Sequence, residues 1–196
     1  KNSQIISEPD QGRRKVLIGL TAGFAAAGVA FAATPFVTTW NPSARAKAIG
    51  SAVKVDVSKM MVGQQIQVSW RKQPILIIRH SPSALSGLAS VTSKLADPNS
   101  DSIDEPYKNI NATRSLSAEY SVLSGVCTHL GCSPKYYPEV EPKPWDSSWE
   151  GGFFCPCHGS MFDLVGRVYK GVPAPTNLTV PPHFFEGSIL TIGEEA

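Results

Sequence analysis

The distribution of apolar residues divides the chain into two parts of different character. Residues 16–37, VLIGLTAGFAAAGVAFAATPFV, contain no charged side chain. As an α-helix that rises about 1.5 Å per residue, this run matches a hydrocarbon core of about 30 Å. The basic motif GRRK stands just before it, and Trp40 lies beyond its other end. Because positive charge favours the cytoplasmic side of a membrane, the pattern predicts a transmembrane anchor at 16–40, with residues 1–15 in the cytoplasm.

A cleaved export signal is the alternative for the same segment. Ala30-Phe31-Ala32 would supply a small-residue cleavage site, and the paired arginines Arg13 and Arg14 fit a twin-arginine export signal. The apolar run is longer than the 7–15 residues or so that are usual in a signal core, so we expect a retained, single-pass anchor. The twin-arginine route carries folded proteins, so a cofactor could be installed in the cytoplasm before export.

Beyond the anchor, the chain first loses periodicity and then alternates between apolar and polar positions. Residues 41–52, NPSARAKAIGSA, are small and polar, and they predict a flexible hinge linker. Alternation follows at 53–57 and at 65–70, and PILIIRH at 74–80 comes after a short polar turn. These segments predict antiparallel strands, the last two of them paired as a hairpin.

The remaining pattern predicts a mainly β head domain over residues 53–196. A short helix is expected near 83–95, followed by irregular chain. Prolines and glycines become dense in the last third of the sequence, as is typical of a loop-rich β module. TNLTV at 176–180 and SILTIG at 188–193 are the expected closing strands.

Composition adds little to this picture. The chain of 196 residues is 17% charged with a formal net charge of +2, which gives no reason to expect a nucleic-acid partner. Its length allows one sizeable domain in addition to the anchor.

All four cysteines and two of the four histidines fall into two short boxes, CTHLGC at 127–132 and CPCHGS at 155–160. Two thiolates and two imidazoles, one of each from either box, can bind Zn²⁺ or a [2Fe–2S] cluster. Zinc would leave Cys132 and Cys157 unexplained, and its usual signature pairs cysteine with cysteine and histidine with histidine. Two plain disulfides, which are common in exported proteins, would leave the histidines unexplained.

The two boxes resemble the cluster-binding motifs of Rieske iron–sulfur proteins. The order of anchor, linker and head further resembles the Rieske subunit of quinol–cytochrome c reductase (cytochrome bc1) complexes, so the resemblance covers nearly the whole chain. It implies an antiparallel β-sandwich head with an inserted cluster-binding part at about 125–176. It also implies one Rieske-type [2Fe–2S] cluster per subunit as the cofactor.

The resemblance gives the neighbouring cysteines of a box different roles. The implied ligand set has two cysteines on one iron and two histidines on the other: Cys127, Cys155, His129 and His158. Cys132 and Cys157 would form a disulfide that joins the two boxes. Rieske domains of oxygenases typically lack this bridging pair, so its presence favours a high-potential, quinol-oxidising type.

Histidine ligation has an electrostatic consequence. Two thiolates cancel the net charge of two ferric ions and two sulfides, whereas four thiolates would make the oxidised centre a dianion. Adding an electron to a neutral centre costs less, which explains potentials of about −150 to +300 mV instead of about −400 mV. Because reduction also makes an outer imidazole nitrogen more basic, His158 and His129 are the expected catalytic residues, taking up a proton with the electron.

Three positions near the ligand set correspond to positions with known roles in the family, and at one of them the residue differs. Ser160 matches a serine that donates a hydrogen bond to a bridging sulfide, whereas the family's tyrosine two positions later is here Phe162. This departure removes a hydroxyl donor to a ligand cysteine, so we expect a lower potential than in relatives with tyrosine. Leu130 matches an exposed leucine that touches the membrane partner; without the resemblance it would be expected in the core.

GVPAP at 171–175 resembles the family's proline loop, which covers the cluster. Gly171, Pro173 and Pro175 belong to it, and the two prolines pre-set the backbone. We call these five residues the cover loop. Its position after the second box distinguishes it from an ordinary turn.

Other candidates carry no predicted chemistry. His80 and His183 have no cysteine neighbours and are expected to be structural or surface residues. The excursion, defined as residues 136–149 (YYPEVEPKPWDSSW), lengthens the gap between the boxes and is expected to lie on the surface.

The implied function is that of the iron–sulfur subunit of a bacterial cytochrome bc1 complex, a quinol–cytochrome c oxidoreductase. One electron would pass from quinol at cytochrome b, contacted by His158, to cytochrome c1 by movement of the head on its linker, contributing to proton translocation. The implied location is the bacterial inner membrane, with the head on the periplasmic side. The implied partners are cytochrome b, cytochrome c1, quinol and lipid, in a complex that is a dimer.

Three alternatives stay open at this point. A Rieske small subunit of another tethered enzyme, such as arsenite oxidase, would share the anchor and boxes; co-purification with b- and c-type haems would distinguish it. A tethered binding module stabilised by zinc would lack iron and acid-labile sulfide. A Rieske ferredoxin serving an oxygenase is disfavoured by the anchor and the bridging cysteines.

Overall fold

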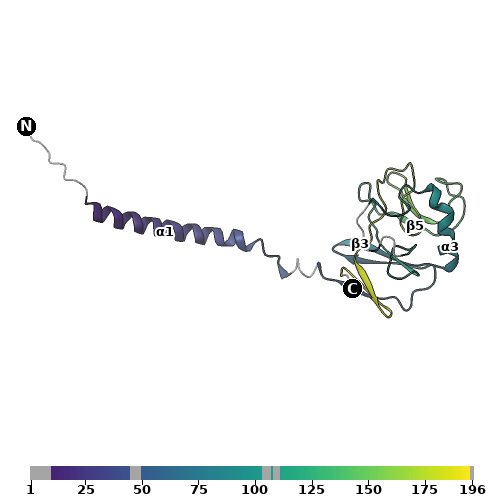
Figure 1. The fold of residues 1–196 in the computed structure, drawn as a ribbon, viewed down its shortest axis with the longest axis horizontal. Helices are drawn as coiled ribbons and strands as arrows, with labels where there is room; N and C mark the ends of the chain where they lie inside the picture. The colour runs from purple at the N-terminus through teal and green to yellow at the C-terminus, as the bar shows by residue number, and fades with distance from the viewer. Residues whose placement is uncertain (1–9, 45–49, 103–106, 108–110, 195–196) are drawn as a thin grey trace, which may run out of the picture. The chain divides into compact units, whose positions relative to one another are not determined.

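A computed structural model describes residues 10–44, 50–102, 107 and 111–194 of the chain (Figure 1). The chain forms two compact units, Lys1–Lys47 and Ala48–Ala196, which are considered separately. Residues 45–49, in the middle of the expected linker, lie outside the described residues, as do residues 1–9 of the expected cytoplasmic segment.

The first unit contains one long helix, α1, which spans Gln11–Thr38. The carboxylate of Asp10 caps it by accepting hydrogen bonds from the backbone N–H groups of Gly12 and Arg13. The helix includes the whole apolar run and the basic motif before it. Among the described residues it is the one helix whose length and composition suit a membrane span.

The second unit is the head, and its described strands form three antiparallel sheets of three strands each. The first sheet has the order β1 (Val53–Asp56), β9 (Ile189–Ile192) and β8 (His183–Glu186). The second has the order β2 (Gln65–Trp70), β3 (Gln73–Arg79) and β4 (Tyr120–Ser124). The third has the order β5 (Lys135–Tyr137), β6 (Gly152–Cys155) and β7 (Ser160–Phe162). The mainly β, antiparallel fold is therefore confirmed.

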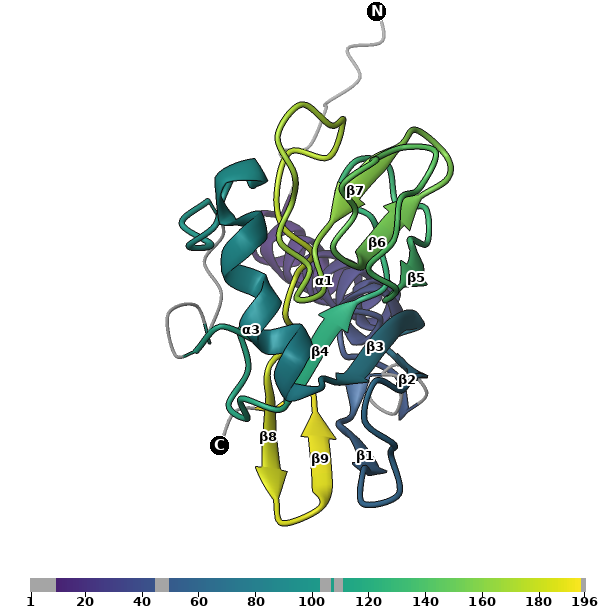
Figure 2. The same ribbon diagram turned by 90° about the vertical axis from the view of Figure 1, so that its right-hand side faces the viewer.

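Strand β3 explains how the three sheets share a core. Ile75 and Ile77 belong to the apolar cluster formed with the first sheet, whereas Leu76 and Ile78 belong to the cluster formed with the third. Because successive side chains of a strand point to opposite faces, a strand covered on both faces needs apolar residues at every position. This accounts for the continuous run PILII. Figure 2 shows β3 and β4 between the β1–β8–β9 end and the β5–β6–β7 end of the head.

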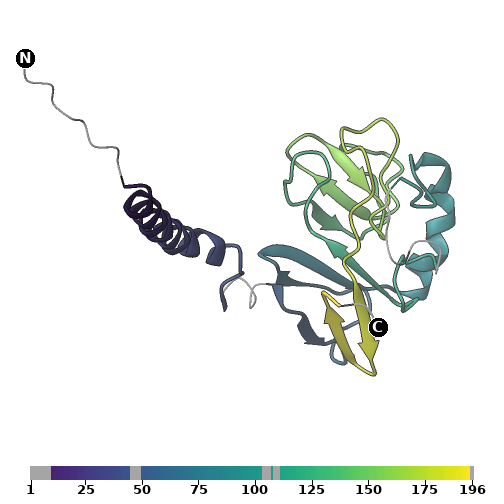
Figure 3. The same cartoon turned by 60° about the vertical axis from the view of Figure 1, so that its left-hand side comes forward.

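The expected helix near 83–95 is present as α3 (Pro82–Val91), continued by the short 3-10 helix η1 (Thr92–Lys94). The hydroxyl of Ser81 caps α3, and Leu88 and Val91 are its buried residues. Figure 3 shows α3 on the flank of the head, beside the loops of the third sheet.

The prediction of a strand at 176–180 is wrong. This segment makes single hydrogen bonds with Ser124 on one side and Gly166 on the other, without a ladder. Pro181 and Pro182 follow and lack the N–H groups that would extend pairing. The closing hairpin is instead β8 with β9, of which the pattern predicted β9 alone.

Candidate metal centre

The two boxes form loops of similar construction. The first follows β4, and the N–H of Gly131 donates to the carbonyl of Cys127 at 2.9 Å. The second joins β6 to β7, and the N–H of Gly159 donates to the carbonyl of Cys155, also at 2.9 Å. Both glycines have φ near +80°, at +83° and +77°, where a side chain would be strained. Each loop thus turns tightly around its first cysteine and projects the histidine that follows.

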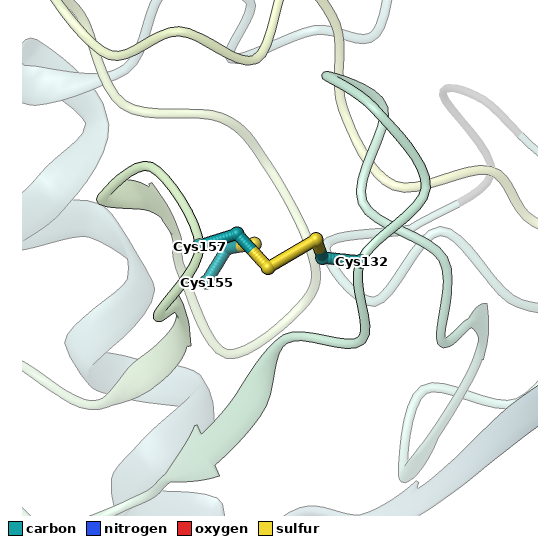
Figure 4. A group of neighbouring side chains, drawn as sticks. All are labelled: Cys132, Cys155 and Cys157. Atoms are coloured by element: carbon teal, nitrogen blue, oxygen red, sulfur yellow. A yellow bond between two sulfur atoms is a disulfide. The ribbon is translucent and has the colours of Figure 1, made fainter.

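A disulfide joins the two loops. Cys132 of the first box is bonded to Cys157 of the second, across 25 residues of sequence (Figure 4). The implied pairing is therefore confirmed, and it leaves Cys127 and Cys155 as free, buried thiols.

The two free thiols are hydrogen-bonded to each other. Burial raises the pKa of the Cys127 thiol, as does its hydrogen bond with the Cys155 thiol. The backbone N–H of His129 and the hydroxyl of Ser160 act in the opposite direction by donating to the same sulfur. A buried thiol pair of this kind becomes a thiolate pair readily only when a metal cation supplies the compensating charge.

The rings of the two box histidines contact each other edge to face. The ring centroids of His129 and His158 are 4.8 Å apart, and the ring planes are nearly perpendicular at 87°. The Nδ1 atom of His129 is buried without a hydrogen-bond partner among the described residues. Buried polar atoms normally have a partner, so this nitrogen is a plausible position for a metal bond. The ring of His158 belongs to an exposed residue.

The predicted ligands fall into two pairs of like residues. The thiols of Cys127 and Cys155 are hydrogen-bonded to each other, and the rings of His129 and His158 contact each other. The sulfurs of Cys132, Cys155 and Cys157 also lie within 4.8 Å of one another, but the disulfide uses two of them, so this group is no ligand set. A pair of thiols and a pair of imidazoles fit a two-iron cluster in which histidines replace cysteines on one of the irons.

Ser160 connects the second box to the cover loop. Its side chain is fully buried, and its Oγ accepts a 3.0 Å hydrogen bond from the backbone N–H of Ala174. With one lone pair occupied in this way, the hydroxyl proton is directed elsewhere, toward the sulfur of Cys127. The hydroxyl thus donates to a cysteine sulfur, and its donation to a bridging sulfide stays a prediction.

The sequence reasoning missed Thr128, which lies between the first two predicted ligands. Its Oγ1 donates a 2.7 Å hydrogen bond to the carbonyl of Thr176, directly after the cover loop. Each box therefore contributes one hydroxyl that holds this loop. A hydroxyl between two candidate ligands was the available signal, but its partner is 48 residues away in the sequence.

The remaining candidates differ in exposure, and their predicted roles stay predictions. Leu130 is exposed (71%) at the end of the first loop, whereas Phe162 is completely buried beside Cys127 and Cys155. In the cover loop, Gly171 has φ of +73°, and Ala174 between the two prolines is buried.

His80 and His183 are structural residues. Both are buried, and their Nε2 atoms bond the hydroxyls of Ser121 at 2.8 Å and Ser115 at 2.9 Å. Burial lowers the pKa of each histidine to about 4. They are therefore neutral at ordinary pH and lie outside the candidate site.

Known proteins are similar to this chain over most of its length. The family model described as "Rieske [2Fe-2S] domain" matches residues 51–182, and the model described as "Ubiquitinol-cytochrome C reductase Fe-S subunit TAT signal" matches residues 6–43. The chain is 48% identical to the ubiquinol-cytochrome c reductase iron-sulfur subunit of Allochromatium vinosum, over 93% of this chain and 89% of that protein. It is 41% identical to the subunit of the same name from Blastochloris viridis, over 92% of both chains. A solved chain from "Hyperthermophilic respiratory Complex III" matches with a TM-score of 0.50 and 27% identity, over 89% of this chain and 98% of that chain.

Proposed function

The chain belongs to the Rieske iron–sulfur subunits of ubiquinol–cytochrome c reductases, and on this premise we propose that it passes one electron from quinol to cytochrome c1. The relatives support this role over that of a small subunit in another tethered oxidoreductase such as arsenite oxidase.

One observation carries the proposal. Two buried free thiols and two mutually perpendicular imidazoles belong to loops that a disulfide ties together. We assign Cys127 and Cys155 to one iron, and His129 and His158 to the other. When bound, the cluster supplies a one-electron carrier in the potential range of about −150 to +300 mV.

The residues of the two boxes and of the cover loop have different roles. The exposed ring of His158 accepts a hydrogen bond from quinol and takes up its proton at the ring nitrogen that is not bound to metal. The exposed apolar side chain of Leu130 packs against cytochrome b near the same place. Ser160, and the cover loop bonded to it, exclude water from the thiol side and donate a hydrogen bond toward sulfur.

The membrane arrangement follows from α1. The helix anchors the protein, and the basic motif at its start favours the cytoplasm for that end and so the periplasm for the head. The membrane is then the bacterial inner membrane, and the complex is a dimer with cytochromes b and c1. Residues 41–52 act as the hinge on which the head moves between the two cytochromes.

Electron paramagnetic resonance of ascorbate-reduced membranes tests the proposal. We expect the characteristic signal of a histidine-ligated [2Fe–2S] cluster, lost in both His129→Ala and His158→Ala. Analysis of the complex purified through this subunit should find iron and acid-labile sulfide, together with b- and c-type haem from the cytochromes. A signal unchanged in either histidine variant, or zinc in place of iron, would contradict the proposal.

A further inference from the structure

The excursion between the boxes ends in a buried aromatic residue, Trp149, which is 1% exposed. Its ring stacks on that of Tyr169, with centroids 6.0 Å apart and an angle of 19° between the planes. Its Nε1 donates a 3.1 Å hydrogen bond to the carbonyl of Tyr137 at the start of the excursion. The two ends of the excursion are thus joined, and its last residue is directed at Tyr169.

Tyr169 and Lys170 lie directly before the cover loop, and we call these two residues its stem. The backbone N–H of Tyr169 donates to the carbonyl of Met161 at 3.1 Å, directly after Ser160. Tyr169 also forms a β-bridge with Leu95, and the next residue, Lys170, donates from its N–H to the carbonyl of Lys94 at 2.8 Å. The stem is therefore held by the second box on one side and by the chain after α3 on the other.

The cover loop itself contacts the same aromatic group. The apolar cluster built from Val91, Leu95, Trp149 and Tyr169 has Val172 of the cover loop packed against it. A change in the position of Trp149 would therefore reach the loop directly as well as through its stem.

Polar contacts fix the excursion from outside. The Nζ of Lys94 donates to the carbonyl of Ser148 at 2.8 Å and to its hydroxyl at 2.7 Å, and it lies 3.7 Å from a carboxylate oxygen of Asp146. Lys94, the last residue of η1, thus joins the excursion to the segment whose next residue, Leu95, pairs with the stem. Trp145 adds a second stack on Phe154, with ring centroids 4.0 Å apart, next to the ligand position Cys155.

We propose that Trp149 is a positioning residue, and that the excursion is a support that holds the cover loop in place over the cluster. The inference rests on the proposed function, because the cluster is what the loop covers. It assigns a role to a segment that contains no ligand. Long loops without secondary structure are uncommon in compact domains, and ordering one costs conformational entropy that a positioning role would explain.

Hydrogen–deuterium exchange of the full-length protein in detergent measures the loop directly. Pro173 and Pro175 have no N–H, so the slow amide in the loop is that of Ala174, bonded to Ser160. In Trp149→Leu, loss of the aromatic stack should accelerate exchange in the peptide covering 171–176 by about fivefold or more. Trp149→Phe keeps part of the stack but loses the Nε1 donor, so its acceleration should be smaller but measurable.

A matched control is Trp70→Leu, which removes a buried tryptophan from the core between the first two sheets. This control should lower thermal stability while leaving exchange of the cover loop and the resonance line shape of the cluster unchanged. In Trp149→Leu, by contrast, the line shape should change together with the exchange rate.

Equal cover-loop exchange in Trp149→Leu and in the control would overturn the proposal. If Trp149→Leu does not accumulate, exchange in Trp149→Phe equal to that of the unaltered protein overturns it as well. Absence of a Rieske-type signal in the unaltered protein would instead contradict the proposed function, while the exchange measurement would still report on the loop.

Discussion

The N–H of Ala174 in the cover loop donates a hydrogen bond to Ser160 in the second box, with the two atoms 3.0 Å apart. The bond has two effects: it keeps the loop close to the box, and it orients the serine hydroxyl so that its proton points toward sulfur. The position of the cover loop and the electronic surroundings of the proposed ligands are therefore linked by one side chain.

Ser160→Ala should lower the midpoint potential. A hydrogen bond to a sulfur that gains negative charge stabilises the reduced state. Its loss at about 1.5–3 kcal/mol for a charge-assisted bond corresponds, for a one-electron carrier, to a decrease on the order of 65–130 mV. Redox titration followed by electron paramagnetic resonance measures this. Ser121→Ala, which removes another fully buried hydroxyl, one bonded to His80, is the control and should leave the potential unchanged.

Phe162→Tyr should raise the midpoint potential. Phe162 is buried in the same apolar cluster as Cys127 and Cys155, and the resemblance implies that a hydroxyl at this position donates to a ligand cysteine. The expected increase is on the order of tens of mV, from one added hydrogen bond. Phe185→Tyr, in the first sheet, supplies the matched control. An unchanged potential in Phe162→Tyr would contradict the account of this family departure.

Stiffening the linker should slow turnover without changing the cluster. Prolines introduced within residues 41–52, for example Ala44→Pro with Ala52→Pro, restrict the backbone freedom that movement of the head would use. Quinol–cytochrome c reductase activity should fall several-fold, while the resonance spectrum and midpoint potential remain those of the unaltered protein. Normal turnover in such a variant would count against movement of the head on this linker.

Much of the fold could be predicted from local patterns. The charge-free run, the alternation before Trp70 and the helix α3 each leave a periodic signal in the sequence, and the boxes specify their chemistry through residue type and spacing. Strand β4 left no such signal, because all five of its residues are buried and their pattern does not alternate. The prediction of a strand at 176–180 was wrong because the two prolines that follow lack the N–H groups that would extend strand pairing, whatever the composition of the segment.

The supports of the site could not be predicted, because they depend on residues far apart in the sequence. The bond between Thr128 and Thr176 spans 48 residues, and that between Lys94 and Ser148 spans 54. No periodicity in either segment indicates its partner. The same reason explains why the excursion could be expected only to lie on the surface, although Trp149 at its end is buried.

The two structural histidines predict how stability depends on pH. The pKa of His80 and of His183 is lowered by burial from 6.5 to about 4 in the folded protein. The unfolded state therefore binds more protons than the folded state between pH 6.5 and 4. The contribution of the two neutral histidines to the free energy of unfolding is fully present above pH 6.5 and decreases as the pH falls through this window. At pH 4 the loss should approach about 3 kcal/mol for each histidine.

Thermal unfolding of the full-length protein in detergent, measured from pH 8 to pH 4, checks this dependence. His183→Gln removes one titrating ring while keeping a side chain that can bond Ser115, whose hydroxyl is 2.9 Å from the histidine ring. The variant should be less stable at pH 8, because the buried amide fits the site less well, but its unfolding temperature should decrease less steeply with acid. Equal slopes for the variant and the unaltered protein would show that His183 is not buried in its neutral form, and the proposed cause of the acid sensitivity would have to be given up.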